Sequence, residues 1–251
     1  MLSFFADITL LELAIIAGVA AFASVIGGVA GYGTGALMPL VLVPIVGAEP
    51  VVPIVALSAL FTNTSRAVAF VNAIDARRAG IVLAASIPTC VLGAYGYSLL
   101  TSKGALVVIG AMMTASVPLR RFLRGRGYRF SDGGLGAAAL GWGVIVGGTT
   151  GAGIILLSML MAAGVEGAAV IATDAVISVV IGIVKIAVFG LAGIVTGKVT
   201  AVAVLIGVVA FPGAFLAKRI VDRLPVHVHT TVLDAVVIFG GVAMLVSALM
   251  R

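Results

Sequence analysis

The chain alternates long apolar segments with short polar stretches over almost its whole length. Ten apolar runs can be marked out: 9–28, 32–47, 51–73, 79–100, 104–120, 134–148, 151–164, 167–191, 199–219 and 230–250. The longest of them match the ~20 residues that a helix needs to cross the hydrocarbon core of a bilayer. The pattern therefore predicts an all-α polytopic membrane protein.

Composition supports the same class. Hydrophobic residues make up 62% of the chain, charged residues make up 10%, and the mean hydropathy is +1.32. A soluble domain of 251 residues does not need so much apolar surface, whereas a bundle of membrane helices does. The 33 glycines suit close helix approach in lipid and would permit a homodimer. Most of the net charge of +6 falls in short loops, so we expect it to meet a lipid bilayer and not nucleic acid.

The second five runs match the first five in order. The matches are Gly33-Thr34-Gly35 with Gly151-Ala152-Gly153, Glu49 with Glu166, Arg66 with Lys185, Arg78 with Lys198, and Gly93-Ala94 with Gly213-Ala214. The offset between matched positions drifts only from 117 to 120, which a few single-residue insertions explain. We therefore expect a first transmembrane repeat at 1–120, a basic cytoplasmic linker at 121–133 and a second repeat at 134–251.

The distribution of basic residues predicts the topology, because cytoplasmic loops carry an excess of Lys and Arg. With ten crossings and the N-terminus outside, the outer loops hold only Lys103, Lys198 and Arg251. The inner loops then hold ten basic residues, namely Arg77, Arg78, Arg120, Arg121, Arg124, Arg126, Arg129, Lys218, Arg219 and Arg223. Five crossings per half place the halves in opposite orientations, which predicts two inverted repeats of about five helical segments each. An eight-crossing alternative, with the second and seventh runs re-entrant, places nine basic residues inside and four outside, and it stays open.

The second and seventh runs are short and begin at glycines. After those glycines, 36–46 and 154–164 each offer only 11 residues, or ~16 Å of helix, and the first contains Pro39 and Pro44. Short, Gly- or Pro-interrupted segments at matching places in two halves point to a transport site near the bilayer midplane. The amides at such helix starts favour an anion. The candidate residues here are Gly33, Thr34, Gly35, Thr149, Thr150 and Gly151.

Arg66 and Lys185 lie inside apolar runs at matching positions of the two halves. A cation in hydrocarbon is costly unless it faces a cavity or a partner, so both are candidate anion ligands. Arg66 follows the polar residues Thr62 and Asn63, which we expect to line a wet cavity with it. The planar guanidinium can bridge two oxygens of a sulfonate or carboxylate. The alternative is that each cation snorkels to the nearer membrane interface.

Asp174 is the one acid deep in a predicted helix. It precedes Lys185 by 11 residues, close to three helical turns, so the two should share a face ~16 Å apart. Three interpretations remain open: a protonatable coupling site, a counter-charge for Arg66 across the repeat interface, or a structural acid satisfied by Thr173.

Other features add little chemistry. Cys90 is alone, and His227 and His229 are too few ligands for a metal site, so we expect no metal and no cofactor. Nothing matches a phosphate-binding loop, a zinc motif or a nucleophile elbow, which argues against an enzyme. Trp142 is expected to anchor a helix at the membrane interface. Residues 9–28 are expected to be a retained helix, because no basic stretch precedes them.

The chain resembles the sulfite exporter TauE/SafE family of bacterial membrane permeases over nearly its whole length. The residues that carry the resemblance are the glycine-rich entry Gly31-Tyr32-Gly33-Thr34-Gly35 to a short helix containing Pro39, the stretch Val55-Ala56-Leu57-Ser58, the element Ile74-Asp75-Ala76-Arg77-Arg78, the Gly93 turn, and the degenerate second copy. The family pattern has Trp where this chain has Ala76. The resemblance implies an inner-membrane protein that moves sulfite, sulfonates or related small organic anions.

These observations together predict a secondary transporter, and electrostatics favours export. With the inside negative, each negative charge that leaves gains ~2.3 kcal/mol per 100 mV. Uptake would instead require a proton, for which Asp174 is the candidate carrier. An anion channel and a non-transporting membrane assembly subunit remain as alternatives.

Overall fold

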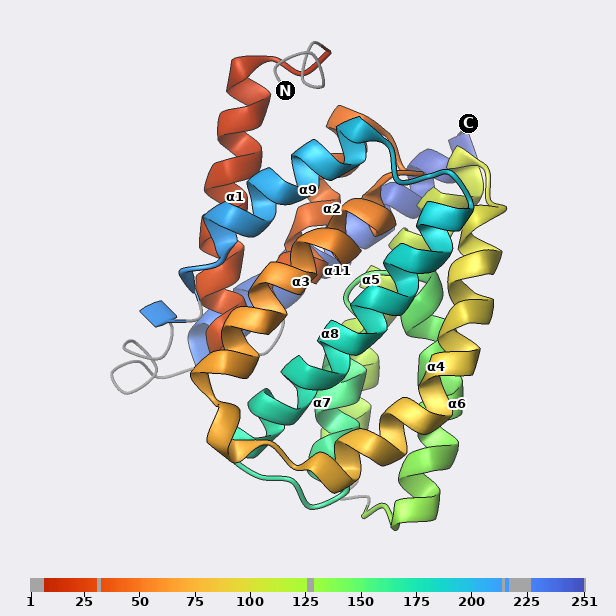
Figure 1. Cartoon of the computed structure of the whole chain (residues 1–251). Helices are drawn as coiled ribbons and strands as arrows, with labels where there is room; N and C mark the ends of the chain where they lie inside the picture. Colours follow the sequence, from red (N-terminus) through yellow and green to blue (C-terminus); the bar gives the residue numbers. More distant parts are fainter. Residues whose placement is uncertain (1–6, 31–32, 126–128, 214, 217–226, 251) are drawn as a thin grey trace.

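The computed structural model describes residues 7–30, 33–125, 129–213, 215–216 and 227–250, with side chains omitted at 27–30, 120–125 and 227–235. The described residues form helices and no strands. The helices are α1 (Leu10–Ala30), α2 (Thr34–Val46), α3 (Val51–Ala69), the 3₁₀ helix η2 (Val71–Ala73), α4 (Ala76–Ser98), α5 (Ser102–Gly125), α6 (Asp132–Gly148), α7 (Gly153–Ala162), α8 (Ala168–Leu191), α9 (Gly197–Ala210) and α11 (His227–Met250) (Figure 1).

Each of the ten apolar runs corresponds to a helix, and the all-helical prediction is confirmed. The largest differences lie at helix ends. The ninth predicted run, 199–219, is interrupted after Ala210 by a turn at Phe211 and Pro212, and residues 213, 215 and 216 are again helical. Helix α5 continues to Gly125, five residues into the segment predicted as a linker. Gly31 and Tyr32 of the glycine-rich entry lie outside the described residues, as do the basic residues Arg126, Lys218, Arg219, Arg223 and Arg251 of the predicted topology.

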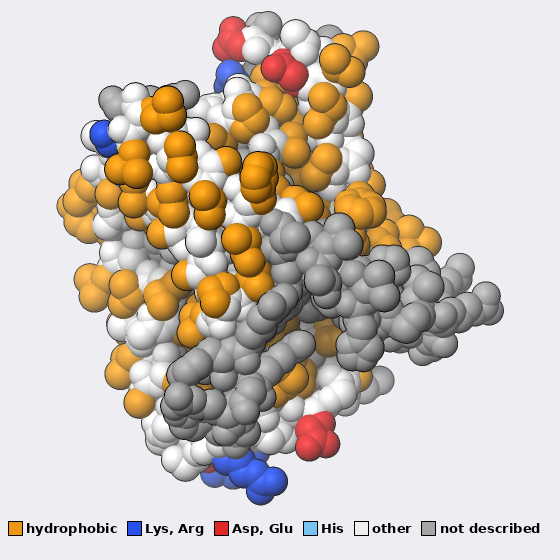
Figure 2. Space-filling view, turned by 180° about the vertical axis from the view of Figure 1, so that it is seen from behind, with side chains coloured by type: hydrophobic (Ala, Val, Ile, Leu, Met, Phe, Trp, Pro, Cys, Tyr) orange, Lys and Arg blue, Asp and Glu red, His pale blue; other side chains and the backbone are white. Residues whose placement is uncertain are grey.

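Four helices are long and apolar enough to cross a membrane within the part of the chain that the structure describes: α3, α4, residues 102–119 of α5, and α8. Shorter apolar helices accompany them. Figure 2 shows hydrophobic side chains over the flank of the molecule and charged side chains at its two ends. A lipid-facing belt between two wetted ends produces this distribution.

Contacts between loops define the two ends of the bundle (Figure 1). At the end that carries the N-terminus, Lys198 pairs with Asp7 at 3.4 Å. There the Tyr97 hydroxyl also donates to the Ala48 carbonyl at 2.9 Å. At the opposite end, Arg77 pairs with Asp132 at 2.6 Å. The starts of α4 and α6 therefore lie together, far from the start of α1.

Glycines let the helices of the bundle approach closely. Helices α4 and α6 form one tight pair, in which a methyl group on Gly93 would lie 2.1 Å from the Val144 carbonyl oxygen. A methyl group on Gly147 would lie 2.3 Å from the carbonyl oxygen of Cys90. Only glycine fits such contacts, in which backbone meets backbone and no side chain can move aside.

Helices α3 and α8 pack against each other at the centre and run antiparallel. Arg66, near the end of α3, contacts Asp174, near the start of α8. Earlier in α3, Leu60 lies against Gly182, further along α8. This crossing positions the polar residues of both helices around one cavity.

Candidate functional site

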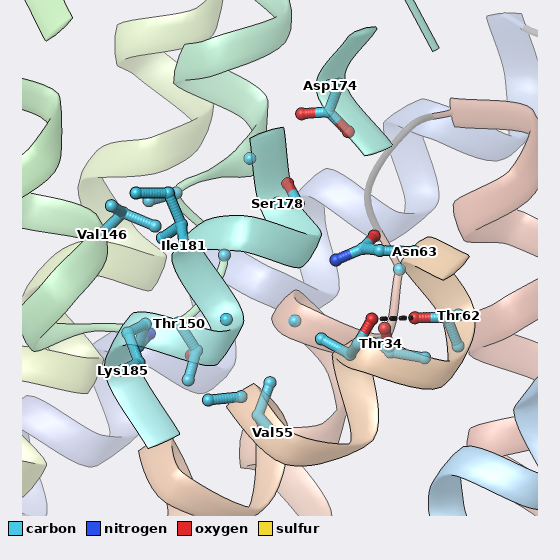
Figure 3. A pocket seen from close by; sticks show the side chains of 18 of the residues that line it. Thr34, Val55, Thr62, Asn63, Val146, Thr150, Asp174, Ser178, Ile181 and Lys185 are labelled. Atoms are coloured by element: carbon cyan, nitrogen blue, oxygen red, sulfur yellow. Dashed lines mark hydrogen bonds between the residues drawn. The ribbon is translucent and has the colours of Figure 1, made fainter. Parts of the chain in front are cut away.

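A cavity of about 130 Å³ lies where α2, α3, α8 and the break between α6 and α7 meet (Figure 3). It has room for several water molecules or a small anion. Every residue that the sequence nominated for a site lines it: Gly33, Thr34, Gly35, Thr62, Asn63, Arg66, Thr149, Thr150, Gly151, Asp174 and Lys185. The structure thus brings these residues together, and their role in binding remains a prediction.

Arg66 and Asp174 form an ion pair across the α3–α8 interface. A guanidinium nitrogen of Arg66 lies 3.3 Å from Oδ2 of Asp174, and the exposed fractions of the two side chains are 12% and 1%. A second nitrogen donates to the Asn63 side-chain oxygen, one helical turn earlier. Arg66 therefore turns inward to a partner and does not snorkel to a membrane interface. Asp174 occupies the position of a counter-charge, one of the three interpretations left open by the sequence.

Among the described residues Oδ1 of Asp174 has no hydrogen-bond partner, so Thr173 does not satisfy it; the Thr173 hydroxyl accepts a hydrogen bond from the backbone N–H of Asp75 at 2.9 Å. The Asp75 carboxylate in turn accepts from the backbone N–H of Arg78 and pairs with the Arg78 guanidinium at 2.6 Å. The hydrogen bond from that backbone N–H, and the guanidinium beside it, hold the pKa of Asp75 below its usual range. This network connects the start of α4 to α8 at the residue next to Asp174.

Lys185 is buried on α8 and has no carboxylate within salt-bridge distance in the described part of the chain. Its ammonium group donates to the Thr149 carbonyl at 2.8 Å, at the C-terminal end of α6. A helix C-terminus carries partial negative charge, which stabilises a nearby cation. Figure 3 shows Lys185 beside Thr150 and Val55 on one side of the pocket, away from Asp174.

The starts of α2 and α7 both face the cavity. Neither helix has a side chain that caps its first turn, so early backbone amides remain available. The two starts are adjacent, because a methyl group on Gly35 would lie 3.1 Å from the Gly151 nitrogen. Gly151 has a φ of +80°, a conformation that other residues rarely adopt. Two positive helix ends therefore converge on one space, as an anion-binding site requires.

Both helices are too short to cross a bilayer. Helix α2 has 13 residues, or ~20 Å, and α7 has 10, or ~15 Å. Helix α7 runs back alongside α6, because the Phe130 N–H, just before α6, donates to the Ala162 carbonyl at the end of α7 at 2.8 Å. The break between α6 and α7 thus lies inside the bundle, where it lines a cavity.

Two buried polar atoms of the cavity wall have no hydrogen-bond partner among the described residues, Oγ1 of Thr150 and Oδ1 of Asp174. Buried polar groups are nearly always satisfied, so their position on a cavity wall indicates a polar content.

Sequence reasoning missed part of the wall. Ser178 lines the cavity one turn after Asp174, a spacing that places both on one helix face. Ser24 also lines it without any sequence signal, and Val55 lines it although the sequence marked Val55 only within the stretch that carries the family resemblance. Two other hydroxyl side chains of α3 do not line the cavity: Ser58 donates to the Val55 carbonyl of its own helix, and Thr64 is exposed.

The prediction for Trp142 is wrong. This side chain is 2% exposed, and its indole N–H donates to the Ala152 carbonyl at 3.0 Å. It therefore holds the break between α6 and α7 and does not anchor a helix in the interface. The carbonyl that it binds belongs to an unwound segment, which no pattern around Trp142 reveals.

Comparison with known families gives a match over most of the chain. The family described as sulfite exporter TauE/SafE matches residues 16–244, which include all of the cavity-lining residues. No curated protein and no solved structure gives a significant match.

Proposed function

The chain belongs to the sulfite exporter TauE/SafE family, and we propose that its cavity binds a small sulfur-containing or organic anion during transport. Membership makes the protein a multi-pass membrane transporter of sulfur anions and not an enzyme. One observation carries the site proposal: a buried Lys185, a largely buried Arg66 and two helix starts without side-chain caps share the walls of a single cavity. Lys185 is the one buried cation among the described residues, and Arg66 lines the same cavity.

We also propose that the two halves are inverted repeats with the cavity at their interface. In this proposal α1, α2, α3, α4 and α5 of the first half correspond to α6, α7, α8, α9 and α11 of the second. When each helix is replaced by its counterpart, every major helix pair becomes a pair that the structure also contains. The pair α4–α6 becomes α9–α1, α3–α9 becomes α8–α4, and both α3–α8 and α5–α11 map onto themselves. The antiparallel crossing of the equivalent helices α3 and α8 is what opposite orientation of the halves demands. This plan places substrate sites at the midplane between repeats.

In the proposed topology, the end of the bundle with Arg77, Arg78 and Arg129 is cytoplasmic and the membrane is a bacterial inner membrane. The proposed direction is export, because the inside-negative potential drives an anion outward by ~2.3 kcal/mol per charge and 100 mV. Import would need a coupled proton, and Asp174 is then the carrier. A homodimer through glycine-rich faces also remains a prediction.

Reconstitution of the purified protein alone into liposomes tests this function. Labelled sulfite or a small sulfonate should leave the liposomes with saturable kinetics, and Arg66→Ala should abolish both flux and anion binding by isothermal titration. Asp132→Asn, at an exposed ion pair outside the cavity, is the matched control and should behave as the wild type.

Each alternative predicts a different result. Flux that never saturates would favour a channel, and absence of flux with a folded protein would favour an assembly subunit. Unchanged anion affinity in Arg66→Ala would remove the proposed role of that residue. For Asp174, an Asn variant whose transport keeps its full dependence on a pH gradient would exclude coupling there.

A further inference from the structure

The cavity carries an uneven set of charges. Of its described lining residues, three have ionisable side chains: Arg66, Lys185 and Asp174. Arg66 and Asp174 neutralise each other at 3.3 Å. Lys185 donates to a backbone carbonyl, which carries a partial charge only. One unit of positive charge is therefore left uncompensated in a buried space.

The unevenness follows from the relation between the halves. The offset of 119 that relates Arg66 to Lys185 also relates Val55 to Asp174. Val55 lines the cavity on the side of Lys185 and away from Asp174 (Figure 3), whereas Asp174 contacts Arg66. The Lys185 side thus has an apolar side chain at the place where the Arg66 side has its carboxylate.

An uncompensated buried cation is costly because desolvation disfavours isolated charge. A monovalent anion restores neutrality to the cavity. A divalent anion of the same size would leave one negative charge in excess, unless Asp174 takes up a proton.

From this charge count we infer that the site takes monovalent oxyanions directly and accepts a divalent oxyanion only together with a proton on Asp174. The inference deepens the proposed function and rests on it. Whether the bound anion is monovalent or divalent, its oxygens lie near Lys185, Arg66 and the amides at the starts of α2 and α7. When a divalent anion binds, the proton comes from solvent and remains on the Asp174 carboxylate while the anion is bound.

The groups that face Asp174 allow this exchange. Arg66 faces it from α3, and Lys185 lies on its own helix. On α4, Arg78 is already paired with Asp75, and Cys90 is a buried thiol. Helices α7 and η2, which also pack on α8, carry no titratable side chain. Protonation at Asp174 is thus the local change that raises the positive charge of the cavity by one.

Methanesulfonate and sulfate are suitable probes, since both are tetrahedral and of similar size but differ by one charge near neutral pH. Titration calorimetry of the purified protein in buffers of different ionisation enthalpy counts the protons taken up. Methanesulfonate should bind without proton uptake and with an affinity independent of pH. Sulfate should take up one proton, and its affinity should fall about tenfold for each unit of rising pH.

Two variants move the charge count in opposite directions. Asp174→Asn makes the cavity doubly positive, so sulfate should gain affinity relative to methanesulfonate and lose its dependence on pH. Lys185→Met removes the excess charge and should reduce methanesulfonate affinity at least tenfold. Asp132→Asn leaves the cavity unchanged and should keep the wild-type preference.

The outcomes separate this inference from the proposed function. Sulfate affinity that does not change with pH, or sulfate binding without proton uptake, would overturn the inference while the anion site stands. Binding of neither probe, nor of sulfite, by a folded protein would overturn the anion site itself. The wild-type measurements need no variant, so a destabilised variant does not leave the question open.

Discussion

The Arg66–Asp174 pair makes a quantitative prediction, because it is an almost completely buried ion pair between two central helices. At 3.3 Å and an effective dielectric constant of about 20, the Coulomb attraction is about 5 kcal/mol. Removing one partner leaves the other charge buried and uncompensated, which costs about 3–5 kcal/mol. Arg66→Met and Asp174→Asn should each reduce the free energy of unfolding by this order.

The double variant should be less destabilised than the sum of the two, because it leaves no unpaired charge at this place. Coupling of this kind appears in a double-mutant cycle as a non-additive term. The exposed pair Arg77–Asp132 is the matched control. Its atoms are closer, at 2.6 Å, but the side chains are 78% and 42% exposed, so it should contribute only ~0–1 kcal/mol.

Equilibrium unfolding in detergent micelles, followed by helical circular dichroism, measures both cycles. The ion-pair interpretation requires a coupling energy at Arg66–Asp174 well above that at Arg77–Asp132. Additive costs at the buried pair would show that the two charges do not depend on each other and would refute the reasoning.

Three further predictions concern the break, the interhelical contacts and the network beside the cavity. Gly151→Ala should destabilise the protein by about 1–2 kcal/mol and weaken anion binding by calorimetry, because φ is +80° there; Gly141→Ala, at an open position of α6 away from the cavity, should be neutral or stabilising and should leave anion binding unchanged. Gly147→Ala should lower the thermal midpoint in detergent by a backbone clash with α4 worth at least ~1–3 kcal/mol, and an unchanged midpoint would contradict the 2.3 Å contact. The depressed pKa of Asp75 means that its contribution to stability is present above the unfolded-state pKa and is lost as pH falls through the folded-state value. Asp75→Asn should therefore flatten the acid limb of a stability–pH profile, and a profile that matches the wild type would count against the network.

Much of the fold follows from the sequence, because helix positions in a membrane protein depend on local composition. Runs of apolar residues located all ten helices, and the glycines before residues 36 and 154 located the two short ones. The position of Arg66 in an apolar run was enough to place it in the cavity wall. Each of these signals is carried by residues close together in the chain.

The rest depends on how distant segments meet, which a single sequence does not record. The pairing of Arg66 with Asp174 requires the antiparallel register of α3 and α8, and residue spacing within either helix cannot supply it. The sequence does not reveal that Trp142 is buried, because its partner, the Ala152 carbonyl, becomes available only at the break before α7. The wall positions of Ser24 and Val55 likewise follow from packing across helices.

Divergence between the two halves explains how the proposed inverted repeat produces a charged site. A perfectly symmetric pair of halves with Arg66-type and Asp174-type residues in both would give two neutral ion pairs and no excess charge. Val55 breaks that balance on one side of the cavity, and the carbonyl of Thr149 holds the remaining cation in place without neutralising it. In this proposal the repeated architecture forms the cavity between two short helices, and Val55, at the position where the other half has an acid, leaves the cavity with the charge that an anion would neutralise.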